Sequence, residues 1–300
     1  MSPFNRPSII CLGEILWDCL PAGLFMGGAP TNVAYHLALH GCDPLIVSAV
    51  GADFLGDEVR RRVAGWGLTT DFLATIADAP TGTVQVDASV PTNPVYTIVE
   101  NVAWDRIPAS DALIDAAPAC AALVFGTLSM REANNRRSLD SVLSVFKGLR
   151  VLDINLRPPF DRPDSIEFAA SRADLLKLND VEVVHDIPGA GRPDPASLHE
   201  HAARWARRCG LKSVCVTAGE RGAGLLWEGE WHWQAGRPVE VKDTVGSGDA
   251  FLAALLASLL GGRLPADALA RACRTGELVA SRSGGTPVYD VRQIDDEAAR

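Results

Sequence analysis

The 300-residue chain lacks the cysteine spacing of a metal site or a disulfide framework. Its seven cysteines, at positions 11, 19, 42, 120, 209, 215 and 273, are scattered, and no two of them form a CxxC pair. Several lie in apolar runs, as Cys215 does. The pattern is typical of reduced, buried thiols in a cytosolic protein.

Long hydrophobic runs and an excess of basic residues are also missing. The most apolar run, 250–260, has about half of the ~20 residues that a membrane-spanning helix needs. The N-terminal run 9–12 is too short for a signal peptide. With 28 basic and 37 acidic residues the net charge is -9, which disfavours nucleic acid because its phosphates need a basic face. We therefore expect a soluble cytoplasmic protein that binds neither membranes nor nucleic acid.

Short apolar runs alternate with longer helical patterns along the chain. The expected strands are 8–12, 45–50, 121–125, 150–154, 175–178, 213–217 and 224–227. The expected helices are 31–40, 55–66, 131–146, 195–208, 250–260 and 266–281. Gly41 and Gly210 fit the position after a helix end. The alternation predicts an α/β fold, a doubly wound and mostly parallel sheet with helices on both faces.

Two segments break this alternation. Residues 15–26 and 81–100 show amphipathic strand patterns with no helix between them, which is typical of a small separate β-sheet. We interpret the sheet as a lid over a site; a decorative hairpin or a contact between subunits would explain the same pattern. The predicted large α/β domain comprises 1–14, 29–80 and 106–300, and the predicted β lid comprises 15–28 and 81–105.

The most informative motif is the segment 243–251, DTVGSGDAF, which leads into the apolar run. Gly246 and Gly248 let the backbone approach an anion because they carry no Cβ, and N–H groups at a helix start attract negative charge. Asp249 would repel a simple anion, but it suits a base that accepts the proton of a hydroxyl attacking phosphorus. A plain helix cap explains the same residues, so the rest of the chain must decide.

Polar residues also gather where other strands end, the edge at which α/β sheets bind ligands. Asp18 follows the first strand, and Gly27 and Gly28 precede Asn32 at the first helix. The carboxylate accepts and the amide both donates and accepts hydrogen bonds, so together they could bind the hydroxyl groups of a polyol. Each residue taken alone is equally explained by a turn of the backbone.

Three further clusters follow later strands. Asn179 and Glu182 have a spacing that suits either the waters of a hydrated Mg²⁺ or a capping box. The glycines of segment 217–222 could cradle a nucleotide or form a hairpin turn. Segment 153–157, DINLR, ends another strand with polar side chains. Five such clusters are hard to attribute to turns alone.

These residues resemble the ribokinase-like (PfkB) family of sugar kinases over nearly the whole chain. Segment 27–32, GGAPTN, is similar to the family's first signature, segment 243–251 to its highly specific second signature, and segment 179–182 to its NxxE element. Within the family the chain looks most like bacterial fructokinases. The residues that carry this likeness are the GGAP form of the first signature and segments 13–18, 100–105 and 153–157.

The resemblance implies a ribokinase-like fold, ATP as the donor, Mg²⁺, and a role for each matching residue. Asp249 would be the base, and the backbone of Gly246, Ser247 and Gly248 would hold the transferring phosphoryl group. The implied sugar-binding residues are Asp18, Gly27, Gly28, Asn32, Trp104, Asn155, Arg157 and Asp249. The implied nucleotide and phosphate residues are Asn179, Glu182, Thr217, Gly219, Gly222, Gly246, Gly248 and Cys273, the last of which replaces an asparagine common in the family. Asn179 and Glu182 would organise Mg²⁺ through water, and Asp243 and Val245 lie where the family often binds a monovalent cation such as K⁺.

The function predicted on this basis is phosphorylation of the primary hydroxyl of D-fructose to fructose 6-phosphate. Ribose, 2-keto-3-deoxygluconate or a nucleoside are alternative acceptors; a sugar acid would need an added cation at the lid, where 94–109 offers only Arg106. A non-catalytic sugar-binding protein is a further hypothesis. A nicotinamide dehydrogenase is excluded because no GxGxxG follows the first strand. The edge of the lid sheet would allow a homodimer.

Overall fold

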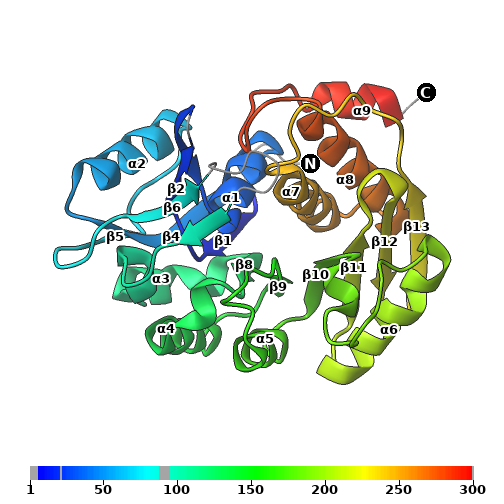
Figure 1. Ribbon diagram of the computed structural model, residues 1–300, viewed down its shortest axis with the longest axis horizontal. Coiled ribbons are helices and arrows are strands. Elements are labelled where there is room, and N and C mark those ends of the chain that lie inside the picture. The colour runs from blue at the N-terminus through cyan, green and yellow to red at the C-terminus, as the bar shows by residue number, and fades with distance from the viewer. Residues whose placement is uncertain (1–5, 21, 88–94, 299–300) are drawn as a thin grey trace.

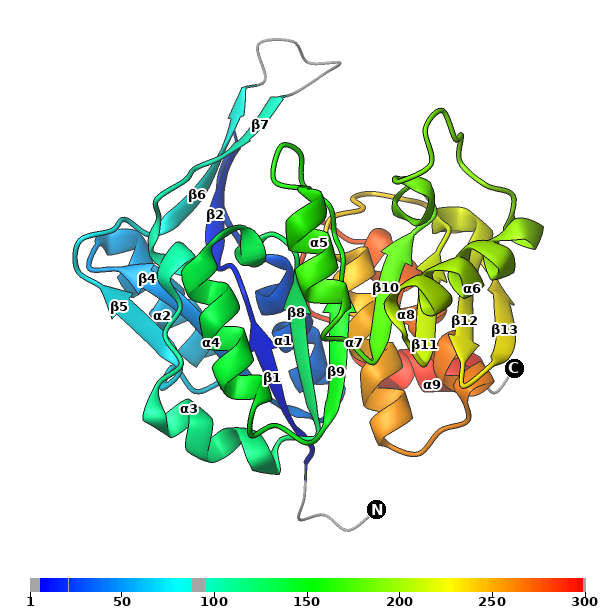
Figure 2. The same cartoon turned by 90° about the horizontal axis from the view of Figure 1, so that it is seen from below.

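The computed structural model describes residues 6–20, 22–87 and 95–298. Within these residues the chain forms a large sheet of nine strands and a small sheet of four. Helices cover both faces of the large sheet (Figure 1), and the small sheet rises from one end of it (Figure 2). None of the helices in this part of the chain is both long and apolar enough to cross a membrane.

The large sheet is parallel except at one edge. Its spatial order is β13 (Glu230–Ala235), β12 (Gly222–Trp227), β11 (Ser213–Thr217), β10 (Leu175–Asn179), β9 (Leu149–Asp153), β8 (Ala122–Gly126), β1 (Ser8–Leu12), β4 (Asp43–Gly51) and β5 (Leu73–Ile76). Every neighbouring pair from β11 to β5 is parallel, while β12 and β13 are added antiparallel. The prediction of a mostly parallel α/β sheet is therefore confirmed.

Two groups of helices cover the two faces of this sheet (Figure 1). One group is α3 (Asp111–Ala116), α4 (Ala133–Leu143), α5 (Pro163–Ala170) and α6 (Leu198–Cys209). The other is α1 (Ala29–Leu39), α2 (Phe54–Gly65), α7 (Ser247–Leu260), α8 (Pro265–Ala280) and α9 (Arg292–Ala298). In β1, Ile10 and Leu12 pack under the first group, and Ile9 and Cys11 under the second. Side chains alternate across a strand, so a strand covered on both faces is apolar throughout.

The small sheet follows directly from the end of β1. Its order is β3 (Gly23–Gly27), β2 (Leu16–Leu20), β6 (Gly82–Asp87) and β7 (Val95–Ile98). Strands β2 and β6 are parallel, and the outer pairs are antiparallel. A separate small sheet is thus confirmed. Residues 21 and 88–94 of the predicted lid lie outside the described residues, and the domain boundaries stay a prediction.

All the strands and helices expected from the sequence are present; 8–12 and 213–217 have the expected ends, and the ends of the others are shifted. The helix expected at 131–146 is α4, preceded by the short 3₁₀ helix η3 (Ser129–Arg131), and the one expected at 195–208 divides into η5 (Pro195–Ser197) and α6. Strands β5 and β13 and helices α3, α5 and α9 were not expected. The sequence signal for strand β13 was the pair Glu228 and Gly229. The two residues form a turn with φ of 49° and 95°, the geometry of a tight hairpin.

Candidate active site

The start of α7 presents open N–H donors on a tightly held loop. Its N-cap residue, Gly246, has a φ of 73°, and a Cβ there would collide with the backbone of Gly285, so the position requires glycine. The Asp243 carboxylate accepts the N–H groups of Val245 at 3.0 Å and Gly284 at 2.9 Å. Among the described residues no acceptor meets the N–H groups of Gly248 and Asp249, which leaves donors open at the positive end of the helix.

Asp249 lies in the first turn of α7 and is half-buried. Its Oδ2 accepts a hydrogen bond of 2.8 Å from Nδ2 of Asn32, at the start of α1. Burial raises the pKa of Asp249 to about 6, and the Asp153 charge adds to the shift; Asn32, Lys177 and Arg157 oppose it. The carboxylate therefore combines a fixed orientation with a raised proton affinity, as suits a base.

A buried ion pair lies beneath this loop. Nζ of Lys177 on β10 donates to both oxygens of Asp153 on β9, at 2.9 and 2.8 Å, and both residues are buried. A Cβ on Gly248 would lie 3.4 Å from that Nζ, so the ammonium approaches the open N–H groups. Sequence reasoning missed Lys177; the signal was a single lysine within an otherwise apolar strand.

Glu14 is a second residue that sequence reasoning did not select. It is buried, its Oε1 accepts the N–H of Ala29 at 3.2 Å, and its Oε2 has no partner among the described residues. Burial raises the pKa of Glu14 to about 7. Gly28 has a φ of 110°, and a Cβ on it would collide with the Glu14 carbonyl. The glycine pair therefore lets α1 begin directly against Glu14.

The predicted sugar residues of β2, β3 and the loop after β9 gather near this point. A Cβ on Gly27 would lie 2.8 Å from Oδ2 of Asp18. Burial raises the pKa of Asp18, while the Arg157 charge opposes the shift. Asn155, with a φ of 41°, lines a small cavity that Glu14 and Asp153 also line. Arg157 is exposed and donates to the Leu156 carbonyl at 2.9 Å.

Asn179 and Glu182 adopt the capping arrangement. Oδ1 of Asn179 accepts the N–H groups of Val181 and Glu182, at 2.9 and 2.8 Å, and Oε2 of Glu182 accepts the N–H of Asn179 at 2.8 Å. Oε1 of Glu182 accepts the N–H of Leu156 at 2.8 Å. Burial raises the pKa of Glu182, and the Lys177 charge opposes the shift. The reciprocal bonds of the capping interpretation are therefore present, in the turn that leads into the 3₁₀ helix η4 (Glu182–Val184).

Three of the predicted nucleotide residues lie at the antiparallel side of the sheet. Thr217 ends β11, Gly219 begins η6 (Gly219–Arg221), and Gly222 begins β12 with a φ of 118°. Cys273 of α8 is buried in the core, where burial raises the pKa of its thiol to about 12. The carbonyl groups of Asp243 and Val245 accept no hydrogen bond from the described residues. Within residues 6–20, 22–87 and 95–298, no three metal-binding side chains form a cluster.

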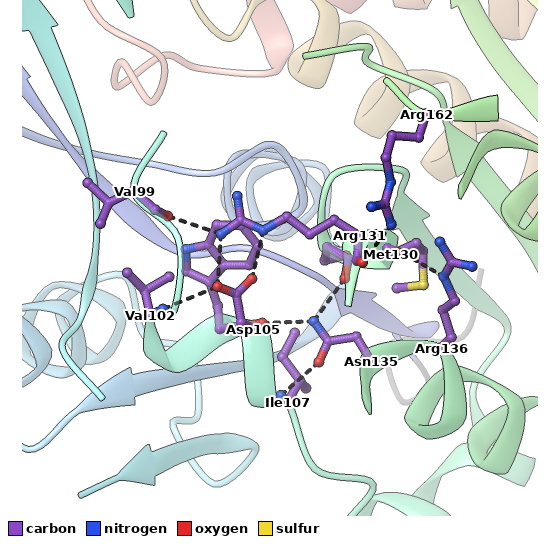
Figure 3. Close-up of polar contacts among 11 residues, drawn as sticks. Val99, Val102, Asp105, Ile107, Met130, Arg131, Asn135, Arg136 and Arg162 are labelled. Carbon is purple, nitrogen blue, oxygen red and sulfur yellow. Dashed lines mark hydrogen bonds and ion pairs between the residues drawn. The ribbon is translucent and has the colours of Figure 1, made fainter. Parts of the chain in front are cut away.

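Asp105 and Arg131 form a buried ion pair (Figure 3), and the guanidinium of this pair covers the ring of Trp104. Trp104 lies in η1 (Ala103–Arg106) and is fully buried. The Arg131 guanidinium stacks 4.1 Å from the Trp104 ring and 4.5 Å from that of Phe160. It also donates to both oxygens of Asp105 at 2.8 Å and to the carbonyl of Val99 at 3.0 Å. The structure thus places Trp104 beneath an arginine, without an exposed face.

Comparison with known proteins identifies the chain as a phosphotransferase that acts on a hydroxyl group. The pfkB family of carbohydrate kinases matches residues 21–291, and the chain belongs to this family. Fructokinases of Klebsiella pneumoniae and Rhizobium leguminosarum are each 28% identical to it, over 85% and 84% of this chain and 85% and 79% of theirs.

Solved structures share the ribokinase-like fold. A structure from Escherichia coli in complex with ATP and Mg²⁺ has a TM-score of 0.82 at 22% identity, covering 97% of this chain and 98% of that one. The 2-dehydro-3-deoxygluconokinase of Thermotoga maritima has a TM-score of 0.85 at 19% identity, covering 98% and 100%. The Escherichia coli structure and the 2-dehydro-3-deoxygluconokinase thus share one architecture.

Proposed function

We propose that this carbohydrate kinase phosphorylates the primary hydroxyl of D-fructose to fructose 6-phosphate with ATP and Mg²⁺. The observation that carries the proposal is the Asp249 carboxylate, oriented by Asn32 beside the open N–H groups of α7. The fructokinase relatives support fructose as the acceptor. Asp249 would take the proton of the sugar hydroxyl as it attacks, and the N–H groups would stabilise the charge on the transferring phosphoryl group.

The residues at the strand ends fit ATP and Mg²⁺. A Mg²⁺ ion keeps several waters, which fits Glu182, because backbone N–H groups already engage both of its oxygens. Asn179 would share this water-mediated contact, and the bound metal would neutralise phosphate charge. Thr217, Gly219, Gly222 and Cys273 would line the nucleotide site, and the free carbonyls of Asp243 and Val245 would hold a monovalent cation.

The sugar would lie between the small sheet and the start of α1. Asp18, Gly27, Gly28, Asn32, Asn155 and Arg157 are the proposed contacts, and the small sheet would close over them and exclude water. Trp104 is buried, so it would support the floor of this lid. The guanidinium of Arg106 pairs with Asp78 at 2.9 Å, so its charge is already compensated. This pairing favours a neutral sugar over a sugar acid as the acceptor.

The test is ADP release from Mg-ATP with fructose, ribose, glucose, 2-keto-3-deoxygluconate and adenosine, each with and without K⁺. Turnover on fructose alone would support the proposed acceptor. Turnover on another compound would overturn fructose and leave the role of Asp249 in place. No turnover on any of them would favour a non-catalytic sugar-binding protein.

The small sheet also supports a homodimer. Leu24 and Phe25 of the edge strand β3 are 46% and 44% exposed, and an unpaired edge with apolar side chains favours pairing with a second copy. Light scattering after size exclusion should give twice the monomer mass. A monomer mass at high protein concentration would contradict the dimer.

A further inference from the structure

A chain of buried and partly buried hydrogen bonds leads to the loop that packs against the proposed phosphoryl site. It joins Arg271 of α8, His40 and His36 at the end of α1, Tyr289, and the carbonyl of Gly285 in the loop between α8 and α9. Arg271 lies 2.8 Å from Nδ1 of His40, and Nε2 of His40 lies 3.4 Å from the Tyr289 hydroxyl. That hydroxyl lies 3.0 Å from Nδ1 of His36, whose Nε2 lies 2.9 Å from the Gly285 oxygen. We call it the Arg271–Gly285 hydrogen-bond chain.

The chemistry of its two ends sets the direction of every bond. A guanidinium only donates, so Nδ1 of His40 must accept and its Nε2 carries the proton. That Nε2–H donates to Tyr289, whose hydroxyl then donates to Nδ1 of His36. The proton of His36 is therefore on Nε2 and is donated to Gly285, whose carbonyl only accepts. Burial lowers the pKa of His36 to about 4 and that of His40 to about 3, which agrees with two neutral rings.

The last acceptor in this chain lies against the active site. A Cβ on Gly246 would collide with the Gly285 carbonyl, and a Cβ on Gly285 would lie 3.3 Å from Nδ2 of Asn32. Gly285 is thus packed between the loop of open N–H groups and the amide that orients Asp249. The same segment is tied by Gly284 to the Asp243 carboxylate.

We propose that His36 is a positioning residue, which uses the Arg271–Gly285 hydrogen-bond chain to hold the Gly285 carbonyl against Gly246 and thereby fixes the phosphoryl-binding loop. The inference rests on the proposed function for its effect on turnover. Its effect on the loop itself is independent of any substrate.

Two substitutions of His36 separate the two ends of its ring. In His36→Gln the amide nitrogen comes close to the place of Nε2 and keeps the donor to Gly285. In His36→Asn the amide oxygen comes close to the place of Nδ1, so the bond to Tyr289 stays and the donor to Gly285 is lost. Both variants lose the imidazole ring and one of its two hydrogen bonds, to Tyr289 in His36→Gln and to Gly285 in His36→Asn, so they form a matched pair.

Hydrogen–deuterium exchange and steady-state kinetics distinguish them. Leaving the Gly285 carbonyl unpaired should make segments 243–248 and 283–288 exchange about tenfold faster in His36→Asn, with kcat about tenfold lower and the KM for sugar little changed. His36→Gln should stay within about threefold of the wild type in both measurements. Equal exchange and equal kcat in the two variants would overturn the proposal.

A second pair keeps the test decisive if His36→Asn does not fold. Tyr289→Phe removes the hydroxyl whose donation to Nδ1 keeps the proton of His36 on Nε2, a constraint that the amide of His36→Gln does not need. Thr275→Val instead removes a buried hydroxyl that donates to the Arg271 carbonyl within α8. Exchange of 283–288 should rise in the first variant alone, and equal exchange in both would refute the proposal. Since exchange needs no substrate, a wild type without kinase activity would contradict the proposed function and leave this result valid.

Discussion

At the scale of single residues, Asp249 carries the proposed chemistry. Asp249→Asn removes the base and leaves the shape and the neighbouring Asn32. We expect kcat to fall by about 10²–10⁴-fold, with little change in fructose binding measured by calorimetry. Nearly wild-type turnover of a folded variant would refute the assignment.

The raised pKa of the same carboxyl predicts a pH dependence. A base must be deprotonated, and burial raises the pKa of Asp249 to about 6. The rate should therefore be flat above neutral pH and should fall tenfold per pH unit well below pH ~6. The kcat/KM profile measures this limb in the free enzyme.

Glu14 provides the control for that profile, because burial raises its pKa to about 7. In Glu14→Gln the acidic limb should persist, since Asp249 is still present. If the limb disappears in Glu14→Gln, it belongs to Glu14 and the prediction for Asp249 is wrong.

At the scale of secondary-structure elements, Arg131 and Asp105 join the base of the small sheet to the start of α4. Their side chains are 3% and 5% exposed. Removing one partner of a buried pair leaves the other charge uncompensated, so Asp105→Asn should lower the free energy of unfolding by about 3–5 kcal/mol. Urea unfolding at pH 7 measures this difference.

The matched control is Asp140→Asn on α4. Asp140 pairs with Arg172 at 2.6 Å, but its side chain is 49% exposed. Solvent screens such a pair, and the expected loss is at most about 1 kcal/mol. A similar loss in both variants would show that the buried pair does not brace these elements.

Local sequence patterns predicted whether a segment is a helix or a strand better than they predicted where it begins and ends. The strand at 213–217 was predicted with its observed ends because its apolar run is bounded on both sides. Helix α7 begins three residues before the expected 250 because Gly246 adopts a left-handed conformation, which the apolar pattern does not encode. Helices α3 and α5 have six and eight residues, too few to establish a helical period.

At the scale of the whole molecule, buried His36 and half-buried His40 make stability depend on pH. Their pKa values of about 4 and 3 lie below the 6.5 of an unfolded chain. Between these values the unfolded state binds more protons, so stability is present above pH 6.5 and is lost as the pH falls towards 4. Each histidine contributes about 1.4 kcal/mol per pH unit in this window.

His36→Gln isolates this contribution, because it removes one titrating group. Between pH 6.5 and 4 its free energy of unfolding should fall less steeply than that of the wild type, by about 1.4 kcal/mol per pH unit. Parallel curves for the two proteins would mean that His36 is protonated in the folded state as well.

The sequence by itself determined the fold class, the order of the motifs and the loop that precedes Asp249, because apolar periodicity and glycine placement act over a few residues. Only the tertiary structure decided which side chains meet. Asn32 and Asp249 are 217 positions apart, and the partners of Lys177, Arg131 and His36 come from other strands, helices and loops. Burial and pairing of a polar group depend on strand register and helix packing, which local patterns do not contain.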